Sequence, residues 1–235
     1  MIYVGTSGYN YPEWKGSFYP ADLSSAKMLP YYAERFQTVE INYTFYRFPN
    51  EKILAGWSAA TPDNFRLTLK APRRITHDSR LRKVEELTQS FCNLAGTLGP
   101  KLGALLFQLP PSFKKDVAVL GDFLASLPPG APAAFEFRHD SWHDDAVWEL
   151  LRSRQKAVCV ADSDERSTPV VETAPFGYFR LRDEGYTDED IEKWARTIGD
   201  VSQRCSPIYV YFKHEEQGKG PEFARKLIDL LPGPA

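Results

Sequence analysis

The sequence predicts an α/β protein that folds as a TIM-type (β/α)8 barrel, and three observations lead to this fold class. The chain has 235 residues, and a barrel of this type typically needs about 250. Strand-like runs, about eight of them, alternate with helix-like segments along the chain, as in a parallel barrel. Hydrophobic residues make up 43% of the sequence, which is enough to fill a core. We therefore expect residues 1–235 to form a single barrel domain.

The predicted strands are short apolar runs with polar or turn-forming residues at their ends. Strands that lie between helices are usually covered on both faces, so we expect each run to be buried on both sides. In chain order the runs are Ile2–Gly5, Thr38–Asn42, Phe65–Lys70, Gly103–Leu109, Ala133–Arg138, Ala157–Ala161, Tyr178–Arg182 and Pro207–Phe212.

Several of the predicted helices carry start signals, and one crossover has no helix pattern. Thr187 precedes an acidic first turn and is expected to be an N-cap. The stretch 162–177 contains Pro169 and Pro175, so we expect the sixth helix to be irregular or missing. The predicted helices are Lys27–Phe36, Glu51–Ala60, Leu81–Leu98, Asp116–Leu127, Asp144–Arg154, Asp188–Ile198 and Pro221–Leu231.

Charge and cysteine content exclude several classes of protein. A formal net charge of −2 and a pI of about 6.1 argue against a general polyanion binder, so any nucleic-acid surface would have to be local. Cys92, Cys159 and Cys205 have no paired spacing, which predicts reduced thiols. Met1 leads directly into an apolar strand, and no segment is long and apolar enough to span a membrane. We therefore expect a cytoplasmic protein with no signal peptide and no membrane contact.

A series of short motifs occurs in a fixed order along nearly the whole chain. They are Gly5-Thr6-Ser7-Gly8-Tyr9, Glu13-Trp14-Lys15-Gly16, Val39-Glu40-Ile41-Asn42, Lys70-Ala71-Pro72-Arg73, Phe107-Gln108-Leu109-Pro110-Pro111 and Glu136-Phe137-Arg138. Together these motifs resemble the signatures of the YecE-like family, the family of domain of unknown function seventy-two. The resemblance implies a TIM-type barrel, in agreement with the strand count, and it implies no particular reaction because the family is largely uncharacterised.

Two stretches depart from the pattern of that family. Arg180-Leu181-Arg182-Asp183 stands where a His-Gly pair often follows the arginine, and Lys213-His214 stands where paired asparagines are usual. If these positions contact a ligand, this member of the family is expected to prefer a different one.

The strand of residues 133–138 is the centre of the predicted site. Side chains alternate across a strand, so Phe135 and Phe137 share one face while Glu136 and Arg138 share the other. In a barrel the outer face meets helices and the inner face can hold paired charges. We therefore expect Glu136 and Arg138 inside the barrel near its carboxyl end, where barrel enzymes keep their chemistry.

The same alternation assigns polar residues of the other strands to the inner face. The pairs are Glu40 with Asn42, Thr68 with Lys70, Leu106 with Gln108, and Arg180 with Arg182, and Asp162 closes the sixth strand. On the eighth strand two inward-facing sets are open, and we favour the first. They are Tyr209, Tyr211 and Lys213, or Val210, Phe212 and His214.

These inner residues predict a pocket in which carboxylates and cations act together. Glu136, held ionised by Arg138, and Glu40, which is less compensated, could divide the base and acid roles. Lys70 could stabilise developing negative charge. The alternative is a purely structural network, because buried charges must be paired whether or not they catalyse a reaction.

Around these three candidate catalytic residues we expect a set of ligand-binding side chains. Amides would orient the ligand and basic groups would balance its negative charge. The candidates are Asn42, Tyr46, Arg73, His77, Gln108, Arg138, Asp162, Arg180, Arg182 and Lys213.

Two loops predict anion binding, and aromatic residues suggest stacking. The loop of residues 70–83 is a local basic run that could hold phosphates, although solvated charge at a helix start explains it equally well. Gly218-Lys219-Gly220-Pro221 opens the final helix, where backbone N–H groups could bind a phosphate. Tyr46 belongs to a crowd of aromatic residues in the first two βα loops. These rings suit stacking on bases or sugars, although such clusters more often pack loops together.

Neither a metal nor a serine nucleophile is expected. The chain has no His-x-x-x-His or comparable ligand spacing, and Ser7 and Ser112 have no visible base partner. Our leading hypothesis is an enzyme, or an enzyme-derived binder, that acts on a phosphorylated or nucleotide-like ligand by acid–base chemistry without metal or cofactor. A metal-dependent phosphoesterase or nuclease and a non-catalytic nucleic-acid-binding module are the alternatives. The substrate, the reaction and the oligomeric state stay open.

Overall fold

Eight parallel strands close into a barrel, which confirms the predicted fold class. The computed structural model describes residues 1–163, 166–183 and 185–231. Hydrogen bonding follows the order β5-β4-β3-β2-β1-β9-β8-β6, and β6 pairs with β5 to close the circle. The strands are β1 (Ile2–Ser7), β2 (Thr38–Ile41), β3 (Arg66–Lys70), β4 (Leu102–Gln108), β5 (Ala133–Glu136), β6 (Ala157–Ser163), β8 (Gly177–Leu181) and β9 (Ile208–Phe212).

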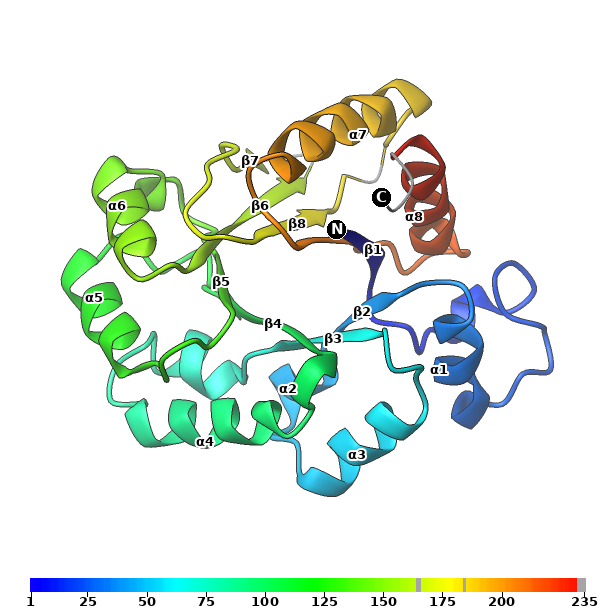
Figure 1. The fold of residues 1–235 in the computed structure, drawn as a ribbon, viewed down its shortest axis with the longest axis horizontal. Helices are drawn as coiled ribbons and strands as arrows, with labels where there is room; N and C mark the ends of the chain where they lie inside the picture. Colours follow the sequence, from blue (N-terminus) through cyan, green and yellow to red (C-terminus); the bar gives the residue numbers. More distant parts are fainter. Residues whose placement is uncertain (164–165, 184, 232–235) are drawn as a thin grey trace.

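Helices surround the barrel as an outer ring (Figure 1). Asn50, Asp116, Asp144 and Thr187 each accept a hydrogen bond from a backbone N–H of the helix that follows, so four of the helices begin at side-chain caps. The helices of the ring are α1 (Ser25–Ala33), α3 (Glu51–Ala59), α4 (Glu85–Gly96), α5 (Val117–Ser126), α6 (Asp145–Ser153), α7 (Asp188–Ser202) and α8 (Lys219–Leu230).

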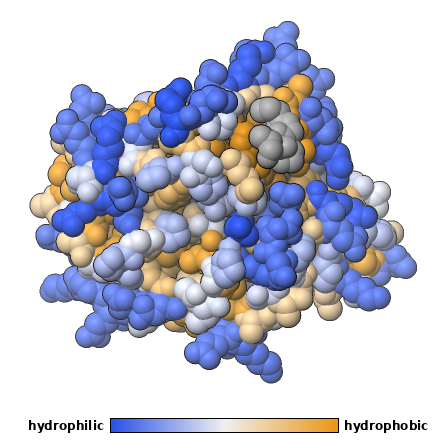
Figure 2. Space-filling view, in the orientation of Figure 1, coloured by the Kyte–Doolittle hydropathy of each residue, from blue (hydrophilic) through white to orange (hydrophobic). Residues whose placement is uncertain are grey.

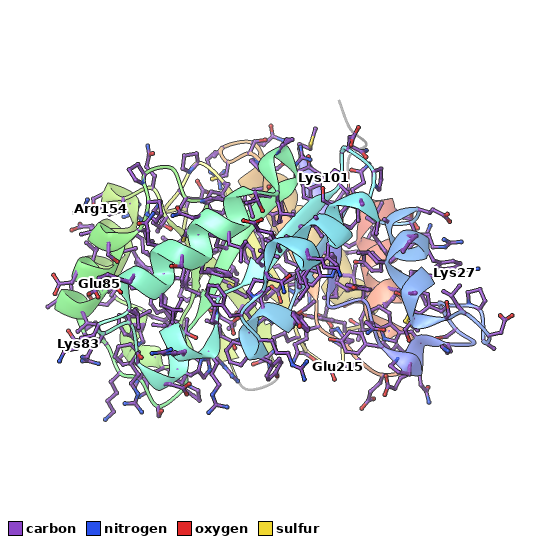
Figure 3. The ribbon with its side chains drawn as sticks, turned by 90° about the horizontal axis from the view of Figure 1, so that it is seen from below. Lys27, Lys83, Glu85, Lys101, Arg154 and Glu215 are labelled. Carbon is purple, nitrogen blue, oxygen red and sulfur yellow. The ribbon has the colours of Figure 1, made fainter. Side chains whose placement is uncertain are left out.

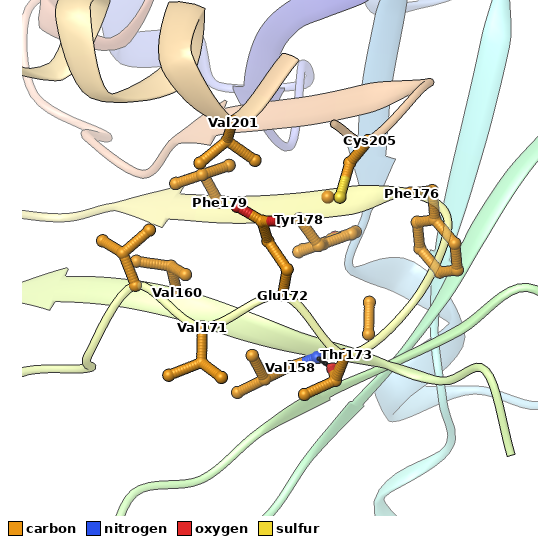
Figure 4. Close-up of a pocket in the computed structure, with 13 residues that line it drawn as sticks. Val158, Val160, Val171, Glu172, Thr173, Phe176, Tyr178, Phe179, Val201 and Cys205 are labelled. Carbon is orange, nitrogen blue, oxygen red and sulfur yellow. Dashed lines mark hydrogen bonds between the residues drawn. The ribbon is translucent and has the colours of Figure 1, made fainter. Parts of the chain in front are cut away.

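The sixth crossover contains no helix in its described residues, as the two prolines predict. A two-residue strand, β7 (Arg166–Ser167), turns back antiparallel to β6, and an extended segment leads to β8. Thr173 fixes this segment to β6, because its hydroxyl donates to the carbonyl of Lys156 and accepts from the N–H of Val158, both at 2.8 Å. Figure 4 shows a small pocket that is lined mainly by apolar side chains of β6, β8 and the segment itself, together with Val201 of α7 and Cys205.

The two faces of the barrel strands carry different side chains. Leucine, valine and phenylalanine residues on the outer face pack against the helices. The inner face carries small residues and four tyrosines, Tyr3, Tyr178, Tyr209 and Tyr211. Tyr3 and Tyr209 stack at 5.5 Å, and the hydroxyl of Tyr211 bonds to Thr38 at 2.7 Å and Thr68 at 2.8 Å. We call these four tyrosines the tyrosine floor.

The eighth parallel strand, β9, turns the first of the two proposed sets inward. Tyr209 and Tyr211 belong to the inner cluster, whereas Val210 and Phe212 belong to the outer one. His214 lies outside with them, and its ring is 5.0 Å from that of Phe223 on α8.

The two ends of the barrel are distinct. In the side view of Figure 3, Lys83 and Glu215 lie in loops that follow strands, at the end opposite Lys101, which immediately precedes β4. Figure 2 shows hydrophilic residues over the outer helices and more neutral and apolar residues toward the centre. Within the described ranges, the structure has no helix of the length and apolar character needed to cross a membrane.

A close backbone approach joins the first two strands. A Cβ atom on Gly5 of β1 would lie 2.2 Å from the carbonyl oxygen of Thr38 and 2.9 Å from the hydroxyl of Tyr32. That hydroxyl accepts from the N–H of Thr6 at 2.8 Å and donates to the carbonyl of Thr38 at 3.1 Å. Tyr32 of α1 therefore links the strands whose ends carry Ser7 and Glu40.

Replacing Gly5 by alanine should destabilise the protein. The new methyl group would have to displace a strand backbone, and overpacking of this kind typically costs about 1–3 kcal/mol. We expect urea unfolding of Gly5→Ala to show a loss of at least this size. Gly56→Ala in α3 is the matched control, because nothing lies within 4 Å of its added Cβ, and it should be neutral or stabilising by about 0.5–1 kcal/mol. Equal effects of the two changes would contradict the close approach.

Candidate functional site

One arginine joins two buried carboxylates at the carboxyl end of the barrel. Arg180 of β8 donates from Nε and Nη2 to Glu40 of β2, with Nη2 at 2.9 Å from Oε1, and from Nη1 to Oε2 of Glu136 on β5. All three side chains are at most 1% exposed. Charge-assisted hydrogen bonds of this kind are strong, and here they connect three strands that are far apart in the sequence.

Other side chains also donate hydrogen bonds to the carboxylate oxygens of Glu40 and Glu136. Ser7 and Tyr178 donate their hydroxyls to Glu40, and Gln108 donates from Nε2 to both oxygens of Glu136 at 2.9 Å. Together with Arg180 they form what we call the ionic network, which consists of Ser7, Glu40, Gln108, Glu136, Tyr178 and Arg180.

The ionic network holds Glu136 in its charged form. Burial alone would raise the pKa of this carboxyl group, but the positive charges of Arg180, Arg182 and Lys70 outweigh burial and lower the pKa to about 2. The sequence predicted Arg138 as the partner that keeps Glu136 ionised. The hydrogen-bonded partner is Arg180, which comes from a strand on the other side of β6.

Lys70 ends β3 at the mouth of the barrel and is only 9% exposed. Its ammonium nitrogen lies 4.2 Å from the centre of the Phe45 ring, on α2 (Tyr43–Tyr46). Burial lowers the pKa of Lys70, and the positive charges of Arg180 and Lys213 add to this effect. Although Glu136 and Glu40 act in the opposite direction, the pKa falls to about 7.

Other basic groups surround the mouth. Arg182 lies 3.8 Å from Glu136, and Lys213 lies 3.7 Å from Glu215. Burial and the charges of Arg180 and Arg182 lower the pKa of Lys213. The mouth is therefore more basic than the slightly acidic protein as a whole.

His77 lies beside Lys70 on a π-helix (Arg74–Asp78). Its ring packs against Phe45 at 4.9 Å, and its Nδ1 bonds to the hydroxyl of Thr76 at 2.9 Å. Burial, followed by the charges of Lys70, Arg73 and Arg138, lowers the pKa of His77 to about 4. The imidazole is therefore neutral at physiological pH.

Three predicted residues lie apart from the ionic network. Asp162 is on the outer side of β6, where it accepts hydrogen bonds from Tyr186 at 2.7 Å and Trp194 of α7 at 3.3 Å. Tyr46 is 76% exposed, and Arg73 pairs with Asp78 at 3.1 Å on the surface. Asn42, in contrast, joins the network by donating to the hydroxyl of Ser7 at 2.9 Å.

Sequence reasoning did not assign Ser7 or Tyr178 to the site. Both positions follow from strand parity, because Ser7 ends β1 and Tyr178 is two residues before Arg180 on the same face. A serine and a tyrosine carry no charge, so nothing in their chemistry marked them as partners of a buried carboxylate.

The two predicted anion loops have other structural explanations. Arg80 donates to Ser112 at 3.3 Å and Arg82 pairs with Asp116 at 2.8 Å, so these arginines fasten the basic run to the next loop. At the start of α8, a Cβ on Gly218 would meet Ser17 at 2.6 Å and one on Gly220 would meet the carbonyl of His214 at 2.9 Å. Close packing therefore accounts for both glycines.

The geometry offers no donor set for a metal within residues 1–163, 166–183 and 185–231. No three histidine, cysteine, aspartate or glutamate side chains of these ranges gather in a way that could hold an ion. The carboxylates of Glu40 and Glu136 already accept hydrogen bonds from Arg180.

The fold and the site define a class of protein: a parallel barrel with a buried ionic network and a weakly basic lysine at the carboxyl ends of its strands. This chain belongs to the family described as protein of unknown function DUF72, whose model matches residues 3–234. The resemblance noted in the sequence is therefore confirmed.

Relatives with curated names cover almost the whole chain. UPF0759 protein YecE of Escherichia coli strain K12 is 33% identical over 235 residues, which span 98% of this chain and 81% of that protein. UPF0759 protein YunF of Bacillus subtilis strain 168 is 27% identical over 278 residues, or 98% and 95% of the two chains.

Solved structures of this family have the same fold. A DUF72 family protein from Thermotoga maritima superposes with a TM-score of 0.82 at 28% identity, covering 98% of both chains. A DUF72 family protein from Enterococcus faecalis gives 0.81 at 21% identity and covers 98% of this chain and 95% of its own. The second likeness concerns the fold alone.

Removing the charge of Arg180 should strongly destabilise the protein. Arg180→Met leaves two buried carboxylates without their cation, and breaking a buried pair in this way typically costs about 3–5 kcal/mol. Glu136 has a pKa of about 2 in the fold, against 4.5 for an ordinary glutamate. Its contribution to stability is therefore complete above pH 4.5 and is lost as the pH falls toward 2. The deficit of Arg180→Met, measured by urea unfolding, should shrink as the pH falls from 7 to 3.

Arg204→Met is the matched control for this measurement. Arg204 also binds a carboxylate, that of Glu172, at 2.8 Å, but its side chain is 57% exposed. Exposed ion pairs typically contribute under about 1 kcal/mol, so the control should lose little at any pH. A loss for Arg180→Met no larger than that for Arg204→Met would show that the ionic network does not depend on the arginine.

Proposed function

We propose that the mouth of the barrel binds a small anionic ligand of phosphorylated or nucleotide-like chemistry and transfers protons to or from it without a metal. The observation that carries this proposal is the use of one cation by two acids. Arg180 contacts both Glu40 and Glu136, so further basic side chains at the mouth are left to balance charge from outside the protein.

The surplus of positive charge supports an anionic ligand. Lys70, Arg182 and Lys213 all lie at the carboxyl ends of their strands, and each is close enough to Arg180 or Glu136 to alter a pKa in the cluster. Like charges held together are unfavourable unless something neutralises them. A phosphate-sized anion among these three groups would relieve their mutual repulsion and gain charge-assisted hydrogen bonds.

We assign the proton transfer to Lys70 in place of Glu136. The sequence suggested that Glu40 and Glu136 titrate, but Glu136 has a pKa of about 2 and its oxygens accept hydrogen bonds from Arg180 and Gln108. Lys70 has a pKa of about 7 and exchanges readily between ammonium and amine at neutral pH. A group whose pKa matches the working pH is the most effective general acid or base.

Exposed rings beside the mouth support a ligand with a flat or sugar-like part. Tyr43 and Tyr46 of α2 are 39% and 76% exposed, and the ring of Tyr46 lies 5.0 Å from that of Phe45, which contacts Lys70. Rings next to basic groups stack well on bases, as in proteins that bind single strands.

Sulfate provides a test of anion binding because its charge is constant between pH 6 and 9. Sulfate affinity, measured by calorimetry, should fall as the pH rises through about 7, since Lys70 then loses its proton. Lys70→Met should weaken binding at pH 6 by about ten-fold, the equivalent of about 1.4 kcal/mol, which is close to the lower limit of about 1.5 kcal/mol for a hydrogen bond to a charged group. The same variant should flatten the pH dependence.

Lys70→Arg is the control, because arginine keeps its charge throughout this range. It should bind sulfate at pH 9 more tightly than the original protein does. Other charged groups also act on this position, namely Arg180, Glu136, Glu40 and Lys213. His77, whose pKa is about 4, stays neutral throughout. A sulfate affinity that changes neither with pH nor in Lys70→Met would contradict the proposal.

A further inference from the structure

Lys70 differs from the other two buried lysines in how its nitrogen is satisfied. Lys101 donates to two backbone carbonyls at 2.7 and 2.8 Å, and Lys156 donates to one at 2.7 Å. Among the described residues, no hydrogen-bond acceptor and no carboxylate within 4 Å serves the nitrogen of Lys70, which rests on the face of Phe45. A buried lysine without an acceptor is costly as a cation, so its neutral amine is favoured.

The neighbouring carboxylates do not supply that acceptor because the ionic network already uses them. Glu136 faces Arg180 and Gln108, and Glu40 faces Arg180, Tyr178 and Ser7. Two acids therefore lie close enough to Lys70 to affect its pKa, yet neither forms an ion pair with it.

Basic and neutral groups complete the surroundings of the amine. Arg180 comes from β8 and Lys213 follows β9, while the neutral imidazole of His77 packs against Phe45, the ring that Lys70 also contacts. A desolvated lysine beside another cation is the arrangement that activates an amine toward carbonyl compounds.

We infer that Lys70 forms a Schiff base with the carbonyl group of an anionic aldehyde or ketone. The inference rests on the proposed anion site only for the part of the ligand that carries negative charge. The amine and its position on β3 determine the covalent step. The substrate class is thus a carbonyl compound with a phosphate or similar anionic group.

The covalent step needs no oxidant or cofactor. The nitrogen lone pair of Lys70 forms a bond to the carbonyl carbon, and the electrons of the C=O π bond move to the oxygen. Transfer of a proton from nitrogen to oxygen gives a carbinolamine. The C–O bond then breaks and the oxygen leaves as water after taking up a second proton, which leaves an iminium ion bound to the lysine. The sum is amine plus carbonyl plus one proton, giving iminium plus water.

Borohydride trapping tests this step with a matched pair of aldehydes, pyridoxal 5′-phosphate and pyridoxal. The protein is incubated at pH 7 with each probe, reduced, digested and mapped by mass spectrometry. We expect one modified lysine, Lys70, labelled at least about ten-fold faster than an ordinary exposed lysine, because a pKa of about 7 leaves much of Lys70 unprotonated at pH 7 whereas an ordinary lysine has a pKa of about 10.4. The phosphorylated probe should label faster than pyridoxal, and sulfate should slow it.

Two variants separate the covalent role from charge and from folding. Lys70→Arg keeps the positive charge and should abolish the fast labelling, while its circular dichroism and sulfate binding persist. Lys226→Arg on α8, where the side chain pairs with Asp188 at 2.8 Å, is the control outside the site and should leave labelling of Lys70 within about two-fold of the original rate. The rate should also rise through pH 7 and level off, whereas an ordinary lysine accelerates up to about pH 10.

Each result separates the two proposals. Sulfate binding without preferential labelling of Lys70 overturns the Schiff base and leaves the anion site intact. Rapid labelling of Lys70 by both probes alike, with no competition from sulfate, supports the Schiff base and overturns the anion site. Labelling spread evenly over surface lysines in the original protein and in Lys70→Arg overturns the inference.

Discussion

The contact on which the site depends is the guanidinium of Arg180 between the carboxylates of Glu40 and Glu136. Charges this deeply buried are tolerated only when they are paired and hydrogen-bonded, and the planar fork of an arginine can serve two acids at once. The pairing has a chemical consequence as well as a structural one. Glu136 is held as a charged acceptor with a pKa of about 2, whereas Lys70, with a pKa of about 7, can change its protonation state near neutral pH.

The barrel makes this division of roles possible because it brings distant strands to one opening. Glu40, Lys70, Glu136 and Arg180 come from four strands that span 141 residues of the printed sequence, and all lie at the carboxyl ends. The irregular sixth crossover does not disturb this end. Its extended segment is fastened to the start of β6 through Thr173, at the opposite end of that strand from Asp162.

Strand alternation in the sequence was enough to predict the fold and most of the inner face. Glu40, Lys70, Gln108, Glu136 and Arg180 were all assigned inward, and each takes that position. Alternation states which face a residue occupies but not its height in the barrel or the direction of its side chain, so it named Arg138 as the cation beside Glu136 and did not find the hydrogen bond from Arg180. Asp162 shows a second limit. Cys159 faces inward, so the alternation along the strand places Asp162, three residues later, on the outer face. We expected Asp162 at the mouth because it is acidic and ends the strand.

The tyrosine floor has a consequence for how anything reaches Lys70. Tyr3, Tyr178, Tyr209 and Tyr211 are at most 5% exposed and fill the lower half of the barrel. A guest molecule meets a wall of rings and hydroxyls below the lysine and must come and go through the upper opening. In the proposed complex the part of the ligand that meets Lys70 would therefore enter first, and the rest of the ligand would cover the amine and keep bulk water away from it.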